Sequence, residues 1–92
     1  MLRLLFVRHG RTFWNAQGRV QGGGALDALG RAQASALGER LRDELLDAIY
    51  ASPALRARQT ARAVARIHDI KVRQRHLLQD LLLRVLNQFA IP

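Results

Sequence analysis

The sequence predicts an α/β domain of three layers with a parallel sheet, and three observations lead to this class. The apolar run Leu2–Val7 carries one charge and has no polar alternation, which is typical of a strand covered on both faces. Two stretches with the apolar spacing of helices follow it, and short β-prone segments alternate with them. The order strand, helix, strand, helix, strand favours right-handed crossovers, and these give a parallel sheet.

The size and composition of the chain limit what it can be. The 92 residues make one small domain, residues 1–92, with a modest core. The sequence contains no cysteine, so disulfides and thiolate metal sites are excluded and a reducing cytoplasm is the expected compartment. No window approaches the roughly 20 apolar residues of a membrane span, and the first apolar stretch is too short for a signal peptide. We therefore expect a soluble, cytoplasmic protein that does not use the membrane as a partner.

The formal net charge is +8, from 15 basic and 7 acidic residues, and every basic residue except Lys71 is an arginine. Such an excess favours anionic partners, either nucleic acid or a small phosphorylated molecule. The aromatic residues are scattered singly, which disfavours base stacking, and no nucleic-acid-binding module is recognisable. A small basic nucleic-acid-binding protein therefore stays the alternative interpretation, and a steeply salt-dependent gel shift would support it.

The first strand ends at Arg8-His9-Gly10. Open α/β sheets bind their ligands at the carboxyl ends of the strands, so Arg8 and His9 are candidates for a functional site. Gly10 removes side-chain bulk beside the imidazole, and we expect the backbone there to approach a ligand closely. Residues 11–26 then form a long, glycine-containing loop of the kind that is often functional. This loop is not a P-loop, because no Gly-Lys-Ser/Thr follows its glycines.

A first helix is predicted to begin after Asp27, as its N-cap, and to continue to about Leu46. A row of residues at spacing four indicates the face that packs on the sheet: Leu29, Gln33, Leu37, Leu41 and Leu45. The apolar segment 48–51 predicts a second buried strand.

Ser52 as N-cap and Pro53 at the first helical position predict a second helix, which continues to about His68. Arg56 lies in its first turn, where unpaired backbone N–H groups point beyond the helix end. The helix also carries a basic stripe at spacing four, formed by Arg58, Arg62 and Arg66. We interpret this stripe as a solvated face, with anion binding as the alternative.

The remainder of the chain is predicted as a third strand, 70–73, and a final helix. Residues 77–86 are rich in leucine, with only Gln79, Asp80 and Arg84 as polar interruptions. This composition indicates a helix that is apolar over most of its surface and needs other elements to cover it.

Taken together, these pieces resemble the histidine phosphatase superfamily, the phosphoglycerate-mutase-like enzymes. The matching pieces are Arg8-His9-Gly10 with Thr12 and Asn15, Gln21-Gly22, the fragment from Leu29-Gly30 to Gln33-Ala34, and the segment from Tyr50 to Ala61. The resemblance implies a phosphoglycerate-mutase-like fold and an enzyme that acts on phosphomonoesters, as a phosphatase or a mutase, without metal or organic cofactor.

The resemblance also implies the roles of individual residues. His9 would be the nucleophile that forms a phosphohistidine, because a neutral imidazole with one nitrogen hydrogen-bonded presents a lone pair on the other. Arg8 and Arg56 would bind the phosphate, since guanidinium groups stay charged and offer forked donors. Further phosphate-binding positions are Thr12, Asn15, Gln21 and Gly22. The expected partner is a small phosphorylated substrate or inorganic phosphate.

Two departures from the family pattern affect the expected activity. The proton donor of the family is usually a glutamate, and Asp80 falls in the corresponding register without the glycines that normally follow, so it is either that acid or an aspartate on a helix surface. The family's second histidine, which precedes a glycine, has no match, because His68 and His76 precede Asp69 and Leu77. Losing one preorganised cationic donor costs on the order of 10²–10³ in rate, so we expect phosphate binding with slow turnover.

These departures predict an incomplete, truncated domain and leave one further alternative open. In the family the strand that carries the first histidine is interior, and without its neighbour it would be an unprotected edge. We therefore expect self-association into a homo-oligomer, or a marginal fold with a mobile end after Val72. A catalytically dead remnant that oligomerises and binds phosphate is the alternative to an enzyme.

Overall fold

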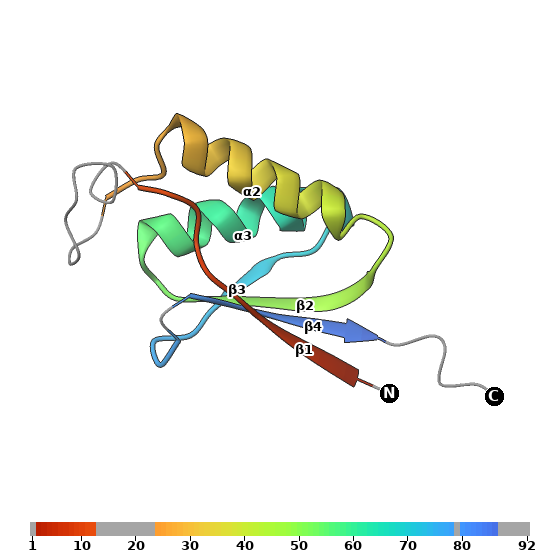
Figure 1. Cartoon of the computed structure of the whole chain (residues 1–92). Helices are drawn as coiled ribbons and strands as arrows, with labels where there is room; N and C mark the ends of the chain where they lie inside the picture. The colour runs from red at the N-terminus through yellow and green to blue at the C-terminus, as the bar shows by residue number, and fades with distance from the viewer. Residues whose placement is uncertain (1, 13–23, 79, 87–92) are drawn as a thin grey trace.

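The computed structural model describes residues 2–12, 24–78 and 80–86 of the chain (Figure 1). Its elements, in chain order, are β1 (Leu2–Val7), α2 (Ala28–Arg40), β2 (Leu45–Ala51), α3 (Leu55–His68), β3 (Val72–Gln74) and β4 (Leu81–Leu86). The four strands form one sheet in the order β1-β4-β2-β3. Both helices lie on the same face of this sheet (Figure 1). The described residues therefore form two layers rather than the predicted three.

The sheet is mixed, so the prediction of a parallel sheet is only partly correct. β2 and β3 are parallel, whereas β4 runs antiparallel to both β1 and β2. The predicted helix over 77–86 is wrong, because its second half forms β4. The reason is the period of burial: Leu81, Leu83 and Val85 are at most 1% exposed and all point toward the helical layer, while the intervening side chains point away. Two strand neighbours and one buried face outweigh the helical propensity of leucine.

The strand β1 forms one edge of the described sheet. On its other side it pairs with β4, from Leu2 opposite Leu86 to Val7 opposite Leu81. The expectation that β1 is an edge strand is therefore confirmed, since its outer side has no partner among the described residues. Leu4 and Phe6 alternate with the residues that face the core, and they are 54% and 77% exposed.

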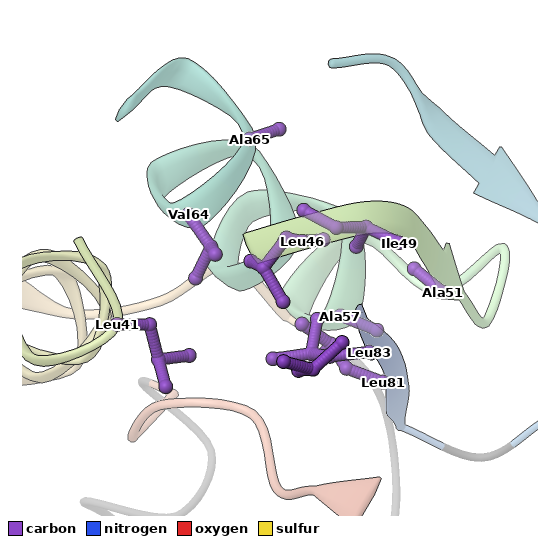
Figure 2. Close-up of a cluster of buried hydrophobic side chains, with 11 residues drawn as sticks. Leu41, Leu46, Ile49, Ala51, Ala57, Val64, Ala65, Leu81 and Leu83 are labelled. Atoms are coloured by element: carbon purple, nitrogen blue, oxygen red, sulfur yellow. The ribbon is translucent and has the colours of Figure 1, made fainter. Parts of the chain in front are cut away.

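The buried core lies between α3 and the two central strands, β2 and β4 (Figure 2). Ala57, Ala61 and Val64 of α3 are fully buried, as are Ile49 of β2 and Leu83 of β4. Small residues on α3 allow the helix to lie close to the sheet, and packing of this density holds it in one orientation. The first turn of α3 is thereby fixed relative to the strand ends.

None of the described helices combines the length and apolar character that crossing a bilayer requires.

The helix α2 begins as predicted and ends earlier. Asp27 is its N-cap and accepts a hydrogen bond from the Gly30 N–H at 2.7 Å. The helix stops at Arg40, and Leu45 belongs to β2, so the predicted end near Leu46 is wrong. The predicted leucine face is also wrong in part, because the buried residues of α2 are Gly30, Ala34 and Gly38, whereas Leu29 is 46% exposed. These small residues bring α2 into contact with α3.

The helix α3 begins at Leu55, two residues later than predicted. The Ser52 hydroxyl accepts a hydrogen bond from the Ala54 N–H at 3.1 Å, but the N-cap position belongs to Ala54 and has no side-chain capping bond. Pro53 is therefore part of the turn that leads into the helix. The N-terminal N–H groups of α3 lack the side-chain acceptor that a serine cap would have supplied.

Candidate active site

His9 lies two residues after β1 and keeps 18% of its side chain exposed. Its Nδ1 is 2.6 Å from the carbonyl oxygen of Gly10. A carbonyl oxygen only accepts hydrogen bonds, so in the neutral ring Nδ1 carries the proton and Nε2 keeps its lone pair. The local backbone thus selects the tautomer whose Nε2 can act as a nucleophile.

Asp80 lies beside this imidazole, directly before β4. Its carboxylate oxygen Oδ1 accepts a hydrogen bond from the His9 backbone N–H at 3.2 Å and lies 3.9 Å from Nε2 of the ring. Its own carbonyl oxygen accepts from the Ser52 N–H at 2.9 Å, which ties it to the end of β2. Of the two interpretations open for Asp80, the helix-surface aspartate is wrong, because the residue leads into a central strand and contacts His9.

Thr60 connects the His9 loop to the first turn of α3. Its hydroxyl accepts a hydrogen bond from the Gly10 N–H at 3.0 Å and donates one to the Arg56 carbonyl at 2.8 Å. Thr60 is 1% exposed, and Arg56 is half-buried at the second position of the helix. Our reading of the sequence missed this role of Thr60. The available signal was a hydroxyl on an otherwise apolar helix face, one turn after Arg56.

Gly10 and Gly30 allow the loop after β1 to lie against α2. A Cβ atom on Gly10 would clash with the Gly30 carbonyl, and one on Gly30 would clash with the Arg11 carbonyl. The close approach at Gly10 is to the backbone of α2, and close approach of a ligand to the same backbone stays a prediction. Its consequence for the site is a fixed position for the residue next to His9.

Asp27 holds Arg11, the residue of the loop that follows Gly10. Its Oδ2 accepts from the Arg11 Nε at 2.6 Å, and its N–H donates to the Arg11 carbonyl at 2.9 Å. Burial by itself would raise the pKa of Asp27, but the hydrogen bonds from the Gly30 N–H and the Arg11 guanidinium outweigh it, and the pKa is lowered. Gln33 also contributes, since its Oε1 accepts from the Arg11 N–H at 2.9 Å. The sequence predicts the cap but not these loop contacts.

Arg8 is exposed and lies between two small cavities. One, of about 320 Å³, is also lined by His9, Gly10 and Thr60, and the other, of about 150 Å³, is also lined by Asp80. Arg8, His9 and Asp80 thus share one region of the surface, next to the first turn of α3. The structure thus brings an imidazole, a carboxyl group and a guanidinium cation together in one region of the surface.

The other predicted site residues divide into two groups. Thr12 is buried and forms an isolated bridge with Leu26, at the base of the loop. Asn15, Gln21 and Gly22 lie outside the described residues. Over the ranges that the structure covers, no group of three or more His, Asp or Glu side chains is arranged to hold a metal ion.

Comparisons with known proteins agree with this geometry. A profile of the histidine phosphatase superfamily (branch 1) matches residues 4–87. A probable phosphoglycerate mutase of Erwinia tasmaniensis is 39% identical over an alignment of 90 residues that covers 96% of this chain and 42% of that protein. A metal-independent phosphoserine phosphatase of Arabidopsis thaliana is 39% identical over 90 residues, covering 85% of this chain and 38% of that protein.

Solved structures show the same likeness. The mycobacterial glucosyl-3-phosphoglycerate phosphatase, in its complex with VO3, superposes with a TM-score of 0.78 at 32% identity and covers 86% of this chain and 38% of that one. The chain thus spans about two fifths of the length of the relatives that it matches.

Proposed function

This chain belongs to the histidine phosphatase superfamily, and we propose that it transfers the phosphoryl group of a small phosphomonoester through a covalent intermediate on His9. The observation that carries the proposal is the contact of the His9 imidazole with the Gly10 carbonyl. Its Nδ1 is 2.6 Å from the Gly10 carbonyl, which leaves the Nε2 lone pair directed away from the backbone contact. A neutral imidazole in this state is a nucleophile near neutral pH, whereas a lysine would be protonated and a carboxylate would repel the substrate dianion.

The proposed reaction has two displacement steps at phosphorus. In the first, the Nε2 lone pair attacks phosphorus, the bond from phosphorus to the ester oxygen breaks, and the departing oxygen takes a proton from a carboxylic acid. In the second, water attacks phosphorus and gives a proton to the carboxylate, while the bond from phosphorus to Nε2 breaks. Transfer to a second substrate molecule instead of water would make the reaction that of a mutase.

We assign the acid and base role to Asp80. Its Oδ1 lies 3.9 Å from Nε2, so an oxygen bound to the same phosphorus as Nε2 would come within reach of this carboxyl group. The hydrogen bond from the His9 N–H and the bond from Ser52 to the Asp80 carbonyl hold the residue in place. Asp80 is shorter than the glutamate that the family usually has, and its position at the start of β4 brings the carboxyl group close to the ring.

Phosphate binding is proposed for Arg8 and for the first turn of α3 with Arg56. The N-terminus of α3 has no side-chain cap, and its N–H groups and the helix dipole favour an anion there. Guanidinium groups would neutralise charge on the phosphoryl oxygens as it shifts in the transition state. Thr12, Asn15, Gln21 and Gly22 stay predictions as additional phosphate-binding positions.

The substrate class is proposed from the relatives. Their names mention phosphoglycerate and phosphoserine, which are small phosphomonoesters, and we propose a substrate of this class. We also propose that the reaction needs no cofactor and takes place in the cytoplasm. We propose that residues 1–92 form one domain of this family and that turnover by these residues is slow, because none of them matches the family's second histidine.

Hydrolysis of p-nitrophenyl phosphate by the wild-type chain and by His9→Ala tests the proposal. His76→Ala is the matched control, because His76 is an exposed histidine outside the site. We expect slow hydrolysis that His9→Ala abolishes and His76→Ala leaves unchanged. Phosphorus NMR after incubation with a phosphodonor should detect a phosphohistidine, and mass mapping should place it on His9. A fast wild-type rate that survives His9→Ala would refute the assignment.

A second candidate function is a phosphate-binding module that self-associates and turns over little. The exposed Leu4 and Phe6 on β1, at the edge of the described sheet, favour this alternative. Light scattering and phosphate-binding measurements distinguish the two. A stable oligomer that binds orthovanadate without hydrolysing p-nitrophenyl phosphate supports the module, whereas a monomer that forms phosphohistidine supports the enzyme.

A further inference from the structure

A separate cavity of about 460 Å³ lies between α3 and β3, and we call it the arginine cavity. Four cationic side chains line it: Arg58, Arg62 and Arg66 from α3, and Lys71 from the segment before β3. One carboxylate, that of Asp69, is also in its wall. The basic stripe that the sequence suggests as a solvated face is therefore one wall of a concave site. This cavity shares no lining residue with the one beside His9.

The cations of the arginine cavity form no salt bridge with another described residue. Four other arginines, Arg3, Arg11, Arg42 and Arg84, pair with carboxylates, but within the described part of the chain none of the four cations of this cavity does so. The Nε of Arg58 is buried and lacks a hydrogen-bond acceptor. A buried donor without a partner is unfavourable, so Arg58 is a cation whose hydrogen bonding is incomplete in this structure.

The floor of the cavity is apolar. Ala65 is 6% exposed, and Ile70 and Val72 are half-buried against the core. The volume falls within the range of small-molecule sites, roughly 300–1,000 Å³, which combine an apolar lining with a few polar groups. No aromatic side chain lines the cavity, so it lacks the stacking platform that single-stranded nucleic acids use. Shape and chemistry thus indicate a small, multiply charged anion.

We propose that the arginine cavity binds a small molecule carrying several phosphate groups in series. The charges of Arg58, Arg62 and Arg66 recur every four residues and span about 12 Å along the helix, which suits a chain of phosphates better than one. Inorganic tripolyphosphate and nucleoside triphosphates share this chemistry. They differ in the base and sugar that a nucleotide adds, and the flat face of the base would lie over Ile70 and Val72. Binding at this cavity is independent of the phosphoryl transfer proposed for His9.

Titration of the full chain with tripolyphosphate, ATP and adenosine, followed by amide chemical shifts, tests the proposal. Saturable shifts should occur at Ala65, Ile70 and Val72, and the amide of Gly10 reports separately on the His9 site. Tighter binding of ATP than of tripolyphosphate identifies a nucleotide as the better ligand, and the reverse identifies the inorganic ion. Adenosine should not bind, since it carries no phosphate.

The double variant Arg62→Glu/Arg66→Glu should weaken tripolyphosphate binding about tenfold or more, because two charge-assisted contacts are lost. Both residues are exposed, so the fold should tolerate the change. Arg40→Glu is the matched control, an exposed arginine at the end of α2 that lines neither cavity, and it should leave the affinity nearly unchanged.

Four results would overturn the proposal. They are the absence of saturable shifts, shifts confined to Gly10, equal weakening by Arg40→Glu, and tighter binding of a short DNA duplex to the same amides. The third would show a general effect of net charge, and the last would identify a nucleic-acid surface. Because Gly10 is observed separately, failure at the arginine cavity and failure of the proposed His9 chemistry give different results.

Discussion

Thr60 is the residue whose replacement best tests how the site is assembled. Thr60→Val keeps the shape of the side chain but replaces the hydroxyl, which accepts from the Gly10 N–H at 3.0 Å and donates to the Arg56 carbonyl at 2.8 Å. In Thr60→Val the Arg56 carbonyl still accepts a backbone hydrogen bond within the helix, whereas the Gly10 N–H loses its acceptor. The variant therefore isolates the contact that joins the His9 loop to α3.

The burial of Thr60 gives the expected loss in the free energy of unfolding of Thr60→Val. Thr60 is 1% exposed, so water cannot replace the hydroxyl, and a buried donor left unsatisfied costs about 1–3 kcal/mol in the free energy of unfolding. For a chain of this length the melting temperature falls by about 4–8 °C for each kcal/mol. Thr60→Ser keeps the hydroxyl and loses one buried methyl group, at about 1 kcal/mol.

Thr60→Val and Thr60→Ser should differ most in their effect on the candidate active site. Urea denaturation followed by circular dichroism gives the free energies of unfolding, amide exchange of Gly10 gives the local effect, and orthovanadate binding gives the functional one. We expect Thr60→Val to speed exchange at Gly10 and weaken orthovanadate binding, and Thr60→Ser to preserve both. Wild-type stability in Thr60→Val, or equal loss of orthovanadate binding in the two variants, would show that this hydrogen bond does not hold the site together.

Three further predictions concern the surroundings of the site. Gly30→Ala should destabilise the fold by about 1–3 kcal/mol in a urea titration, because its Cβ clashes with the Arg11 carbonyl; a neutral or stabilising effect would contradict the close approach. The lowered pKa of Asp27 gives stability that is complete above its ordinary value of 3.8 and is lost as the pH falls through the folded-state value, so Asp27→Asn should flatten the acid side of the stability curve. If the loss of stability of Asp27→Asn at acid pH equals that of the wild type, Asp27 does not contribute to the pH dependence. Leu83→Ala should cost about 2–5 kcal/mol in thermal unfolding, whereas Leu77→Ala, at a 99% exposed position, should cost almost nothing; equal losses would contradict the placement of β4.

The local signals of the chain were sufficient for much of the fold. The apolar run of β1 and the N-cap at Asp27 depend on residues near one another in the sequence, and the structure has both where the patterns predict them. The motif Arg8-His9-Gly10 likewise predicts a candidate site at the end of β1. The sequence predicts such features because short-range steric effects and hydrogen bonds determine them.

The segment 77–86 could not be assigned in this way. Its leucines favour a helix locally, and only pairing with β1 and β2, whose partner residues are at least 30 positions away in the sequence, makes β4 the better solution. The same pairing brings Asp80 to His9, 71 positions apart in the sequence, and so provides the contact on which the proposed acid role depends. A local pattern holds no information about that distance.

The amino-acid sequence alone thus determined the family, the nucleophile candidate His9 and the cations available to bind an anion. Tertiary structure alone decided which nitrogen of His9 keeps its lone pair, that Thr60 joins the loop to α3, and that the basic stripe lines a cavity. The physical reason is that residue types and their spacing follow from the chain, whereas hydrogen-bond partners and concave surfaces arise only when distant segments pack together.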